Sequence, residues 1–331
     1  MYIAQQVGNA FGGLFAAGIL QLNGTHGMFP RITPSTHMLI STGLSGWHWL
    51  FVIEGSATVG IGLICAFIMP EYPHNSRMLS QTQRDLAVWR IESEAGAAEG
   101  TENESVFRGF GKALADPKLL LMILCNMFSQ GQGSIANFFP AIVSSLGYSS
   151  TISLLLTAPP YILAGFVYYG ITYYSDRQNT AYPIIITCIA IATVMYIIPM
   201  STLNIGARYF SMMVLPFASV GPQILLYKTM NLHLARPVSK RAAASALVNA
   251  IGGTSNIWSS YLYYGPPRFY AAFGTLMGCG LLFAATITTY LFLVRRENKR
   301  LDSGDPVQIA KAIKGGVTEE MVALNWRYEM Y

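Results

Sequence analysis

Several long apolar stretches of this sequence carry polar side chains at helical spacing, and these are the residues that could bind a ligand. Asn126, Gln130 and Asn137 lie at positions i, i+4 and i+11 of one stretch, so they share one face of a helix. Asn249 lies on a similar polar face of a later stretch, together with Ser245. Because a polar group in lipid is costly without a partner, such faces indicate a hydrated cavity or hydrogen bonds to a neighbouring helix.

Two further apolar stretches combine polar residues with residues that interrupt a helix. Tyr161 directly follows two prolines, and Gln223 directly follows a Gly-Pro pair. Several polar, interrupted helices together favour a hydrated cavity over a lipid-filled bundle. The predicted substrate-binding residues are Asn126, Gln130, Asn137, Tyr161, Gln223 and Asn249. For each of them singly, the alternative that the side chain only joins two packed helices stays open.

Glu54 is the one acidic residue well inside an apolar stretch, where a carboxylate is disfavoured by roughly 3 kcal/mol. One interpretation is a carboxylate that takes up and releases protons as part of function. The other is a structural residue that caps a neighbouring helix or forms an ion pair near the membrane surface, because Trp47 of an interfacial aromatic belt lies only seven positions earlier.

Other chemistries lack the motifs they need. The sequence has no hydrolase nucleophile elbow, zinc site or phosphate-binding loop, and its five histidines are scattered. The four cysteines each lie inside an apolar run, which is typical of small buried hydrophobic residues. We therefore predict no catalytic residue, no metal and no cofactor, and a protein that is not an enzyme.

The elements that must position the polar residues are membrane-spanning helices. Of the 331 residues, 52% are hydrophobic and only 11% are charged, against about 25% charged in a typical soluble domain. This composition excludes a disordered chain, a nucleic-acid-binding protein and an ordinary cytosolic enzyme. Eight stretches have the length of about 20 apolar residues that a spanning helix needs. They are 3–22, 47–69, 119–143, 151–174, 181–200, 207–230, 242–264 and 269–294. The predicted fold class is an all-α polytopic membrane protein.

The distribution of basic residues predicts the orientation. With both termini in the cytoplasm, 18 of the 21 Lys and Arg residues lie on the cytoplasmic side, as the positive-inside rule requires. The polar segment 70–118 is then a cytoplasmic linker, and 295–331 is a cytoplasmic tail. Within the linker, Ser80 and Gln83 form a capping-box pattern that starts a short helix ending near Glu94. Asp116 and the proline after it are typical of the start of the third span.

Several stretches, taken in their order along the chain, resemble a known transporter family. They are Gly46–Gly55 (GWHWLFVIEG), Asn137–Val143 (NFFPAIV), Leu155–Tyr161 (LLTAPPY), Ser175–Arg177 (SDR) and Lys240–Ala244 (KRAAA). Together they resemble the fungal allantoate-permease-like branch of the anion:cation symporters, within the major facilitator superfamily. Relatives in that branch import small carboxylates and vitamins such as allantoate, nicotinate, pantothenate or biotin, usually with protons.

The resemblance implies a fold of twelve helices in two halves that rock about a central site. On that template the eight spans correspond to helices five to twelve, so the chain is expected to be truncated at its amino-terminal side. Residues 1–69 are then the last two helices of the amino-terminal half, and 119–294 are the six-helix carboxy-terminal half. The resemblance also assigns Asp176 and Arg177 to a signature that latches the inward-closed state. Residues 28–43 interrupt a loop that is short in the family, and we hypothesise that they are a retained intron.

The predicted function is therefore import of a small organic anion, coupled to protons, by alternating access. We expect a monomer in the plasma membrane whose partners are the anion, the proton and the lipid bilayer, and no nucleic acid. The alternative is a truncated remnant that does not transport, or a membrane nutrient sensor. These two would retain the helices but show no flux of a substrate.

Overall fold

Local sequence signals start two of the helices as predicted, and another local signal ends a third. In the computed structural model, Asp116 caps the helix that begins at Pro117, because its carboxylate accepts a hydrogen bond of 3.0 Å from the Lys118 N–H. One of the two hydrogen bonds of the predicted capping box is present: the Ser80 N–H donates to Gln83 Oε1 at 3.1 Å, at the start of a helix that ends at Ala95. Asn179 ends another helix in the left-handed conformation, with φ of 51°.

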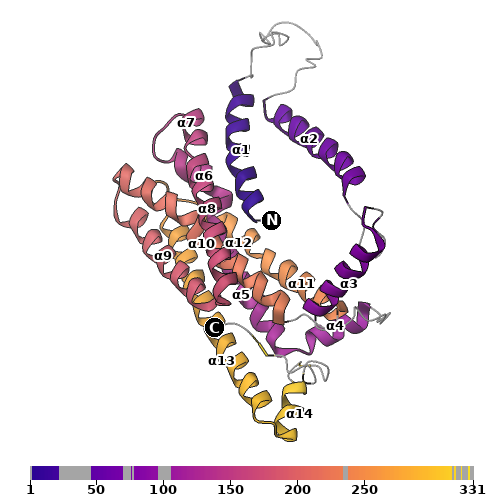
Figure 1. The fold of residues 1–331 in the computed structure, drawn as a ribbon. Helices are drawn as coiled ribbons and strands as arrows, with labels where there is room; N and C mark the ends of the chain where they lie inside the picture. Colours follow the sequence, from indigo (N-terminus) through magenta and orange to yellow (C-terminus); the bar gives the residue numbers. More distant parts are fainter. Residues whose placement is uncertain are drawn as a thin grey trace, which may run out of the picture. The chain divides into compact units, whose positions relative to one another are not determined.

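The structure describes residues 2–21, 46–69, 76, 78–95, 106–233, 238–314, 317, 322 and 327–328. The proposed insert 28–43 lies outside the described residues. All described elements are helices (Figure 1). They are α1 (Tyr2–Gln21), α2 (Gly46–Ile68), α3 (Gln81–Ala95), α4 (Val106–Leu114), α5 (Pro117–Gly133), α6 (Ile135–Ser144), α7 (Ser150–Leu155), α8 (Ala158–Gln178), α9 (Tyr182–Ser201), α10 (Ile205–His233), α11 (Val238–Gly253), α12 (Ser255–Ser259), the 3₁₀ helix η1 (Ser260–Leu262), α13 (Tyr270–Asp302) and α14 (Pro306–Lys314).

The chain divides into two units, one formed by Met1–Ala10 with Gly100–Tyr331 and the other by Phe11–Glu99. The second unit contains α2 and α3. In α2 the stretch Phe51–Ile68 is apolar, and none of it is buried against other protein. A helix that is apolar all round and has no protein cover is suited to lipid. This stretch carries the predicted Glu54, whose side chain is exposed.

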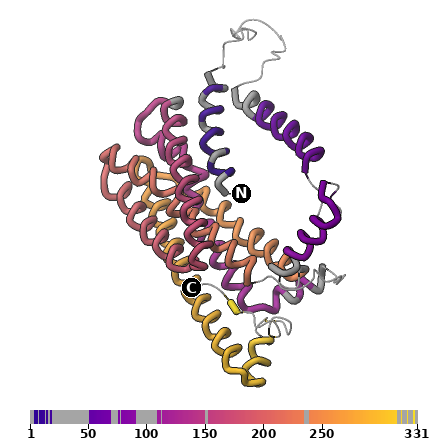
Figure 2. The backbone as a smooth tube through the Cα atoms, in the orientation of Figure 1, coloured from indigo at the N-terminus to yellow at the C-terminus, as the bar shows by residue number. Residues whose placement is uncertain are grey.

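The larger unit is a bundle in which α5 packs against α10, α11 and α13, and α9 packs against α10 and α13. Two clusters of buried apolar side chains form its core. One contains Met122, Ile185 and Phe283, and the other contains Phe139 and Leu215. In Figure 2 the bundle is the set of helices running from magenta to orange, and α13 continues from it to Asp302, where α14 packs beside it.

Helical structure lies at all eight predicted spans, with four differences of detail. The third span is two helices, α5 and α6, with a turn at Ser134 between them. The fourth span is two helices, α7 and α8, with a turn at Leu156 and Thr157 between them. The seventh is α11, α12 and η1 in succession, because a turn interrupts it at Thr254 and the α-helix changes directly to a 3₁₀ helix after Ser259. The eighth continues as α13 to Asp302, past the predicted end at 294.

Among the described residues, six helical segments are long and apolar enough to cross a membrane. They are Phe51–Ile68, Pro117–Ser144, Ile152–Gln178, Tyr182–Ser201, Ile205–His233 and Tyr270–Asp302. The two predicted spans outside this set are α1, whose first half carries three side-chain amides, and the interrupted seventh span. The predicted fold class of an all-α polytopic membrane protein is confirmed.

Candidate functional site

A chain of hydrogen bonds joins two of the predicted substrate-binding residues on α10 and α11. Gln223 Nε2 donates to the Tyr227 hydroxyl at 3.4 Å, and that hydroxyl donates to Asn249 Oδ1 at 2.7 Å. Asn249 Nδ2 in turn donates to the backbone oxygen of Ser245 at 2.9 Å. Gln223 is buried, Tyr227 is half-buried and Asn249 is exposed, so the chain of polar groups leads from the interior of the bundle to its surface.

Tyr227 is the central member of this chain, and the sequence analysis missed it. Tyr227 follows Gln223 by four positions, so both lie on one face of α10. That spacing was the available signal. The protein sequence contains 19 tyrosines, so the spacing alone does not distinguish the hydroxyl of Tyr227 from the others.

Asn126 and Asn137 face helices α11 and α12, which carry the other predicted polar face. Asn126 is fully buried, and its Nδ2 donates to the backbone oxygen of Val248 at 2.8 Å. Asn137 is exposed, and its Nδ2 donates to Asn256 Oδ1 at 3.0 Å. Both contacts match the alternative in which a polar side chain joins two packed helices, because each joins the α5–α6 segment to the α11–α12 segment.

The other two predicted substrate-binding residues have different surroundings. Tyr161 on α8 is buried, and its hydroxyl donates to the backbone oxygen of Ala136 at 2.8 Å, so it joins α8 to α6. Gln130 is half-buried on α5. The structure thus brings Gln223 and Asn249 together through Tyr227, while Asn126, Asn137 and Tyr161 each bond to another part of the bundle.

The described charged residues between 119 and 294 lie at or near helix ends. Arg208 is in the first turn of α10, Lys240 and Arg241 are in the first turn of α11, and Arg268 precedes α13. Asp176 and Arg177 are in the last turn of α8. Lys228, which directly follows Tyr227, lies five residues before the end of α10, and its ammonium group pairs with Asp176. Apart from this ion pair, the middle of these helices offers neutral hydrogen-bonding groups, and a ligand beside Tyr227 would meet amides and a hydroxyl.

The predicted gating residue Asp176 forms an ion pair with a different helix. Lys228 Nζ of α10 lies 2.6 Å from Asp176 Oδ1 and donates to Ser175 Oγ at 3.3 Å. Arg177, predicted to act with Asp176, donates to the Tyr173 hydroxyl of its own helix at 3.3 Å. The contact between helices at this end of α8 is thus made by Asp176 and Lys228, with 59% and 30% of their side chains exposed.

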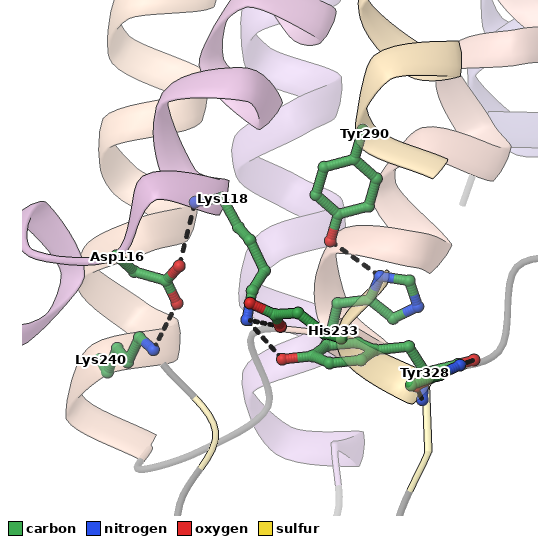
Figure 3. A network of polar contacts seen from close by, with 8 residues as sticks. Asp116, Lys118, His233, Lys240, Tyr290 and Tyr328 are labelled. Atoms are coloured by element: carbon green, nitrogen blue, oxygen red, sulfur yellow. Dashed lines mark hydrogen bonds and ion pairs between the residues drawn. The ribbon is translucent and has the colours of Figure 1, made fainter. Parts of the chain in front are cut away.

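A buried cluster of charged and aromatic residues lies where several helices end (Figure 3). Asp116 accepts from Lys240 Nζ at 2.7 Å, and Lys118 Nζ lies 2.8 Å from Glu297 Oε2. All four side chains are at most 6% exposed. The two cations and two anions balance, as buried charges must. His233 Nδ1 completes the cluster at 2.8 Å from the Tyr290 hydroxyl.

These features together define a polytopic membrane protein with a neutral polar path on one side of a helix bundle and ion pairs at helix ends. The sequence profile of the Major Facilitator Superfamily matches residues 1–260, and the chain belongs to this family. The superfamily expected from the resemblance is thereby confirmed.

The relatives of the chain are named as transporters. The MFS-type transporter cnsO of Penicillium expansum is 28% identical over 97% of this chain, and the major facilitator-type transporter hxnP of Emericella nidulans is 25% identical over 97%. A "Putative tartrate transporter" of Agrobacterium vitis is 30% identical over 37% of this chain and 27% of its own length. The chain spans 61% and 62% of the lengths of the first two relatives. No solved structure matches it.

Proposed function

We propose that the chain is part of a transporter that imports a small organic anion, a carboxylate or a vitamin, together with protons and by alternating access. The family and the names of the relatives support a membrane transporter. The relative named for tartrate, a dicarboxylate, supports an anionic substrate. The quoted sequence stretches support the allantoate-permease-like branch of the anion:cation symporters.

The observation that carries this proposal is the Gln223–Tyr227–Asn249 chain. Its groups satisfy one another in the absence of a ligand, so no polar group of the chain needs to be stranded in an apolar environment. A carboxylate oxygen beside Asn249 would accept hydrogen bonds from the Tyr227 hydroxyl and from side-chain amides in place of these internal bonds. Because one set of hydrogen bonds replaces another, the net gain on binding is small, which suits a ligand that must also be released.

Alternating access further requires contacts that close one end of the site. The Asp176–Lys228 ion pair suits that role because it joins α8 to α10 and is partly exposed, so it can break without burying a lone charge. Lys228 directly follows Tyr227 on α10. The same segment of α10 therefore carries one residue of the proposed binding site and one residue of the proposed gate.

Proton coupling is assigned to Glu54. The described charges of the larger unit lie near helix ends, whereas Glu54 lies within the apolar stretch of α2. A carboxylate in such a place is a candidate for protonation during transport. The orientation with both termini in the cytoplasm, the plasma membrane as location and the monomeric state are further parts of the proposal.

The test is uptake of labelled tartrate, nicotinate and allantoate into membrane vesicles that contain the chain, with an imposed pH gradient. Gln130→Ala, Tyr227→Phe and Asn249→Ala are expected to lower uptake at limiting substrate without lowering the amount of inserted protein. Gln178→Ala, at the exposed end of α8, is the matched control. Glu54→Gln is expected to remove the dependence on the pH gradient.

Each alternative predicts a different result. Equal uptake by Asn249→Ala and the parent would remove Asn249 from the site. If the chain inserts but moves none of the labelled compounds, the transport proposal is wrong for this chain. The remnant and the nutrient sensor then stand, and a sensor would bind a substrate without flux.

A further inference from the structure

The residues Arg327 and Tyr328, which follow α14 in the chain, lie against the ends of three other helices. Tyr328 is 1% exposed, and its hydroxyl accepts a hydrogen bond from Lys118 at the start of α5. Its ring lies edge-on to the ring of His233 at the end of α10, with centroids 5.0 Å apart. Figure 3 shows Tyr328 between Lys118 and His233.

The backbone of Tyr328 is held in both directions by one side chain of α13. The Tyr328 N–H donates to Asn298 Oδ1 at 3.0 Å, and Asn298 Nδ2 donates to the Tyr328 backbone oxygen at 2.9 Å. Arg327 Nε adds an ion pair of 2.7 Å with Asp302 near the end of the same helix. Arg327 and Tyr328, which we call the terminal clamp, are therefore held by specific polar contacts and not by a helix or strand of their own.

The buried charges around the clamp have ion-pair partners that are not part of the clamp. Lys118 has its own carboxylate partner in Glu297, and Asp116 has Lys240. Burial raises the pKa of the Tyr328 hydroxyl, and the nearby carboxylates of Glu297 and Asp116 raise it further, so the hydroxyl remains neutral. Removal of the clamp thus leaves no buried charge unpaired, because the carboxylate that loses Arg327, that of Asp302, is 63% exposed. Release is therefore possible without unfolding the helices beneath it.

The clamp also contacts the helix that carries one residue of the proposed gate. His233, which contacts Tyr328, ends the same helix that carries Lys228, five residues earlier. His233 is further held by the Tyr290 hydroxyl of α13. A clamp that fixes the end of α10 to α13 and α5 restricts the movement that would separate Lys228 from Asp176.

From these contacts we propose that the terminal clamp is a releasable latch that holds the end of α10 in place, and that its release opens the Asp176–Lys228 contact. This regulatory role rests on the gate of the proposed function, but it does not depend on which substrate is carried. The latch is formed by residues of the chain itself. Any event that withdraws Tyr328 would therefore act on the gate from outside the proposed binding site.

The test measures how fast a thiol reagent labels a cysteine introduced beside the Asp176–Lys228 gate. Ser175 is fully buried and lies beside Lys228, so Ser175→Cys reports whether α10 moves away from α8. Ser211→Cys, fully buried near the other end of α10, reports general loosening. Both are made with Cys65→Ser, which removes the exposed native thiol, and the label on the other three buried cysteines is subtracted.

Tyr328→Ala removes both the charge-assisted hydrogen bond from Lys118 and the ring contact with His233. It is expected to raise labelling of Ser175→Cys by more than about tenfold, the change expected from the hydrogen bond alone, with little change at Ser211→Cys. Tyr328→Phe retains the ring and removes the hydroxyl, and it should give a smaller increase in the same direction. Tyr261→Ala, at an exposed tyrosine of η1, is the control and should change neither rate.

Two results would overturn the latch. The first is unchanged labelling at Ser175→Cys in both Tyr328 variants. The second is an equal rise at Ser175→Cys and Ser211→Cys, which would make the clamp an ordinary part of the core. If Tyr328→Ala fails to reach the membrane, Tyr328→Phe decides between these outcomes alone, because its packing is nearly that of the parent.

Discussion

Asn126 occupies the space that a side chain at Gly252 would need. A Cβ atom added at Gly252 would lie 2.2 Å from Asn126 Nδ2, far inside van der Waals contact. The same amide nitrogen donates to the backbone oxygen of Val248, one turn earlier on α11. Glycine at 252 therefore lets α5 and α11 approach closely enough for a side-chain amide of one helix to bond the backbone of the other.

This contact predicts that Gly252→Ala destabilises the protein and that Gly253→Ala does not. The clash should cost about 1–3 kcal/mol, the typical penalty for overpacking a well-packed site. A Cβ at Gly253 would have no atom within 4 Å, so the neighbouring substitution is a matched control. Heat-induced unfolding in detergent measures both. Because Asn126→Ala removes the clashing group, the double variant with Gly252→Ala should be less destabilised than the sum of the singles, and additive losses would contradict the contact.

Gln132 offers a prediction of the opposite sign. Its side chain is fully buried, and neither its amide nitrogen nor its amide oxygen has a hydrogen-bond partner in the part of the chain that the structure describes. An unsatisfied buried amide costs free energy, so Gln132→Leu should stabilise the protein by about 1–3 kcal/mol. The Tyr196 hydroxyl bonds the backbone oxygen of Gln132 and not its side chain, so that contact survives. A lower unfolding temperature for Gln132→Leu would instead show that a polar partner occupies the site.

The buried ion pair between Lys118 and Glu297 should contribute far more to stability than the exposed one between Arg327 and Asp302. Lys118→Ala leaves Glu297 as a lone buried charge, for which the expected loss is about 3–5 kcal/mol. Asp302→Asn removes a partner that is 63% exposed, and its loss should stay below about 1 kcal/mol. Unfolding temperatures of the two variants, compared at low and at high salt, measure the difference. Similar losses for both would mean that the Lys118 site is open to water.

Patterns confined to one helix could be predicted from the sequence, because they depend on neighbours a few residues apart. The cap at Asp116 and the bond between Ser80 and Gln83 are of this kind. The lengths and apolar character of the spans predicted helices at all eight positions. The turn at Ser134 was not predicted, although Gly133 directly precedes it. The superfamily followed from short motifs read in order along the chain.

Contacts between distant residues could not be predicted, because any of several polar partners would satisfy the same chemistry. Lys118 meets Tyr328 across 210 positions, and both lie in segments that were taken as a polar linker and tail. Lys228 pairs with Asp176 of another helix across 52 positions. Gln223 and Asn249 were selected separately for their positions in polar spans, and only the fold shows that Tyr227 joins them.

The Asp176–Lys228 pair gives the last prediction, which separates a specific interhelical contact from a general need for charge. Asp176→Lys alone would place two cations together, and Lys228→Asp alone would place two anions together, so each should weaken closure at this end and lower uptake. The double variant restores an attractive pair with its direction reversed, and it should recover a large part of the uptake of the parent.

Arg177→Gln is the control for this exchange, because Arg177 bonds to Tyr173 on its own helix and not to α10. Its uptake should stay close to that of the parent, since no contact between α8 and α10 is lost. Arg177→Gln could instead lower uptake as much as Asp176→Lys does, while the double variant recovers nothing. In that case the gate would consist of Asp176 and Arg177, as the family resemblance implies. The amount of inserted protein must be equal among the variants, and the exposed positions of both partners make this the expected outcome, because breaking a partly exposed ion pair costs little stability.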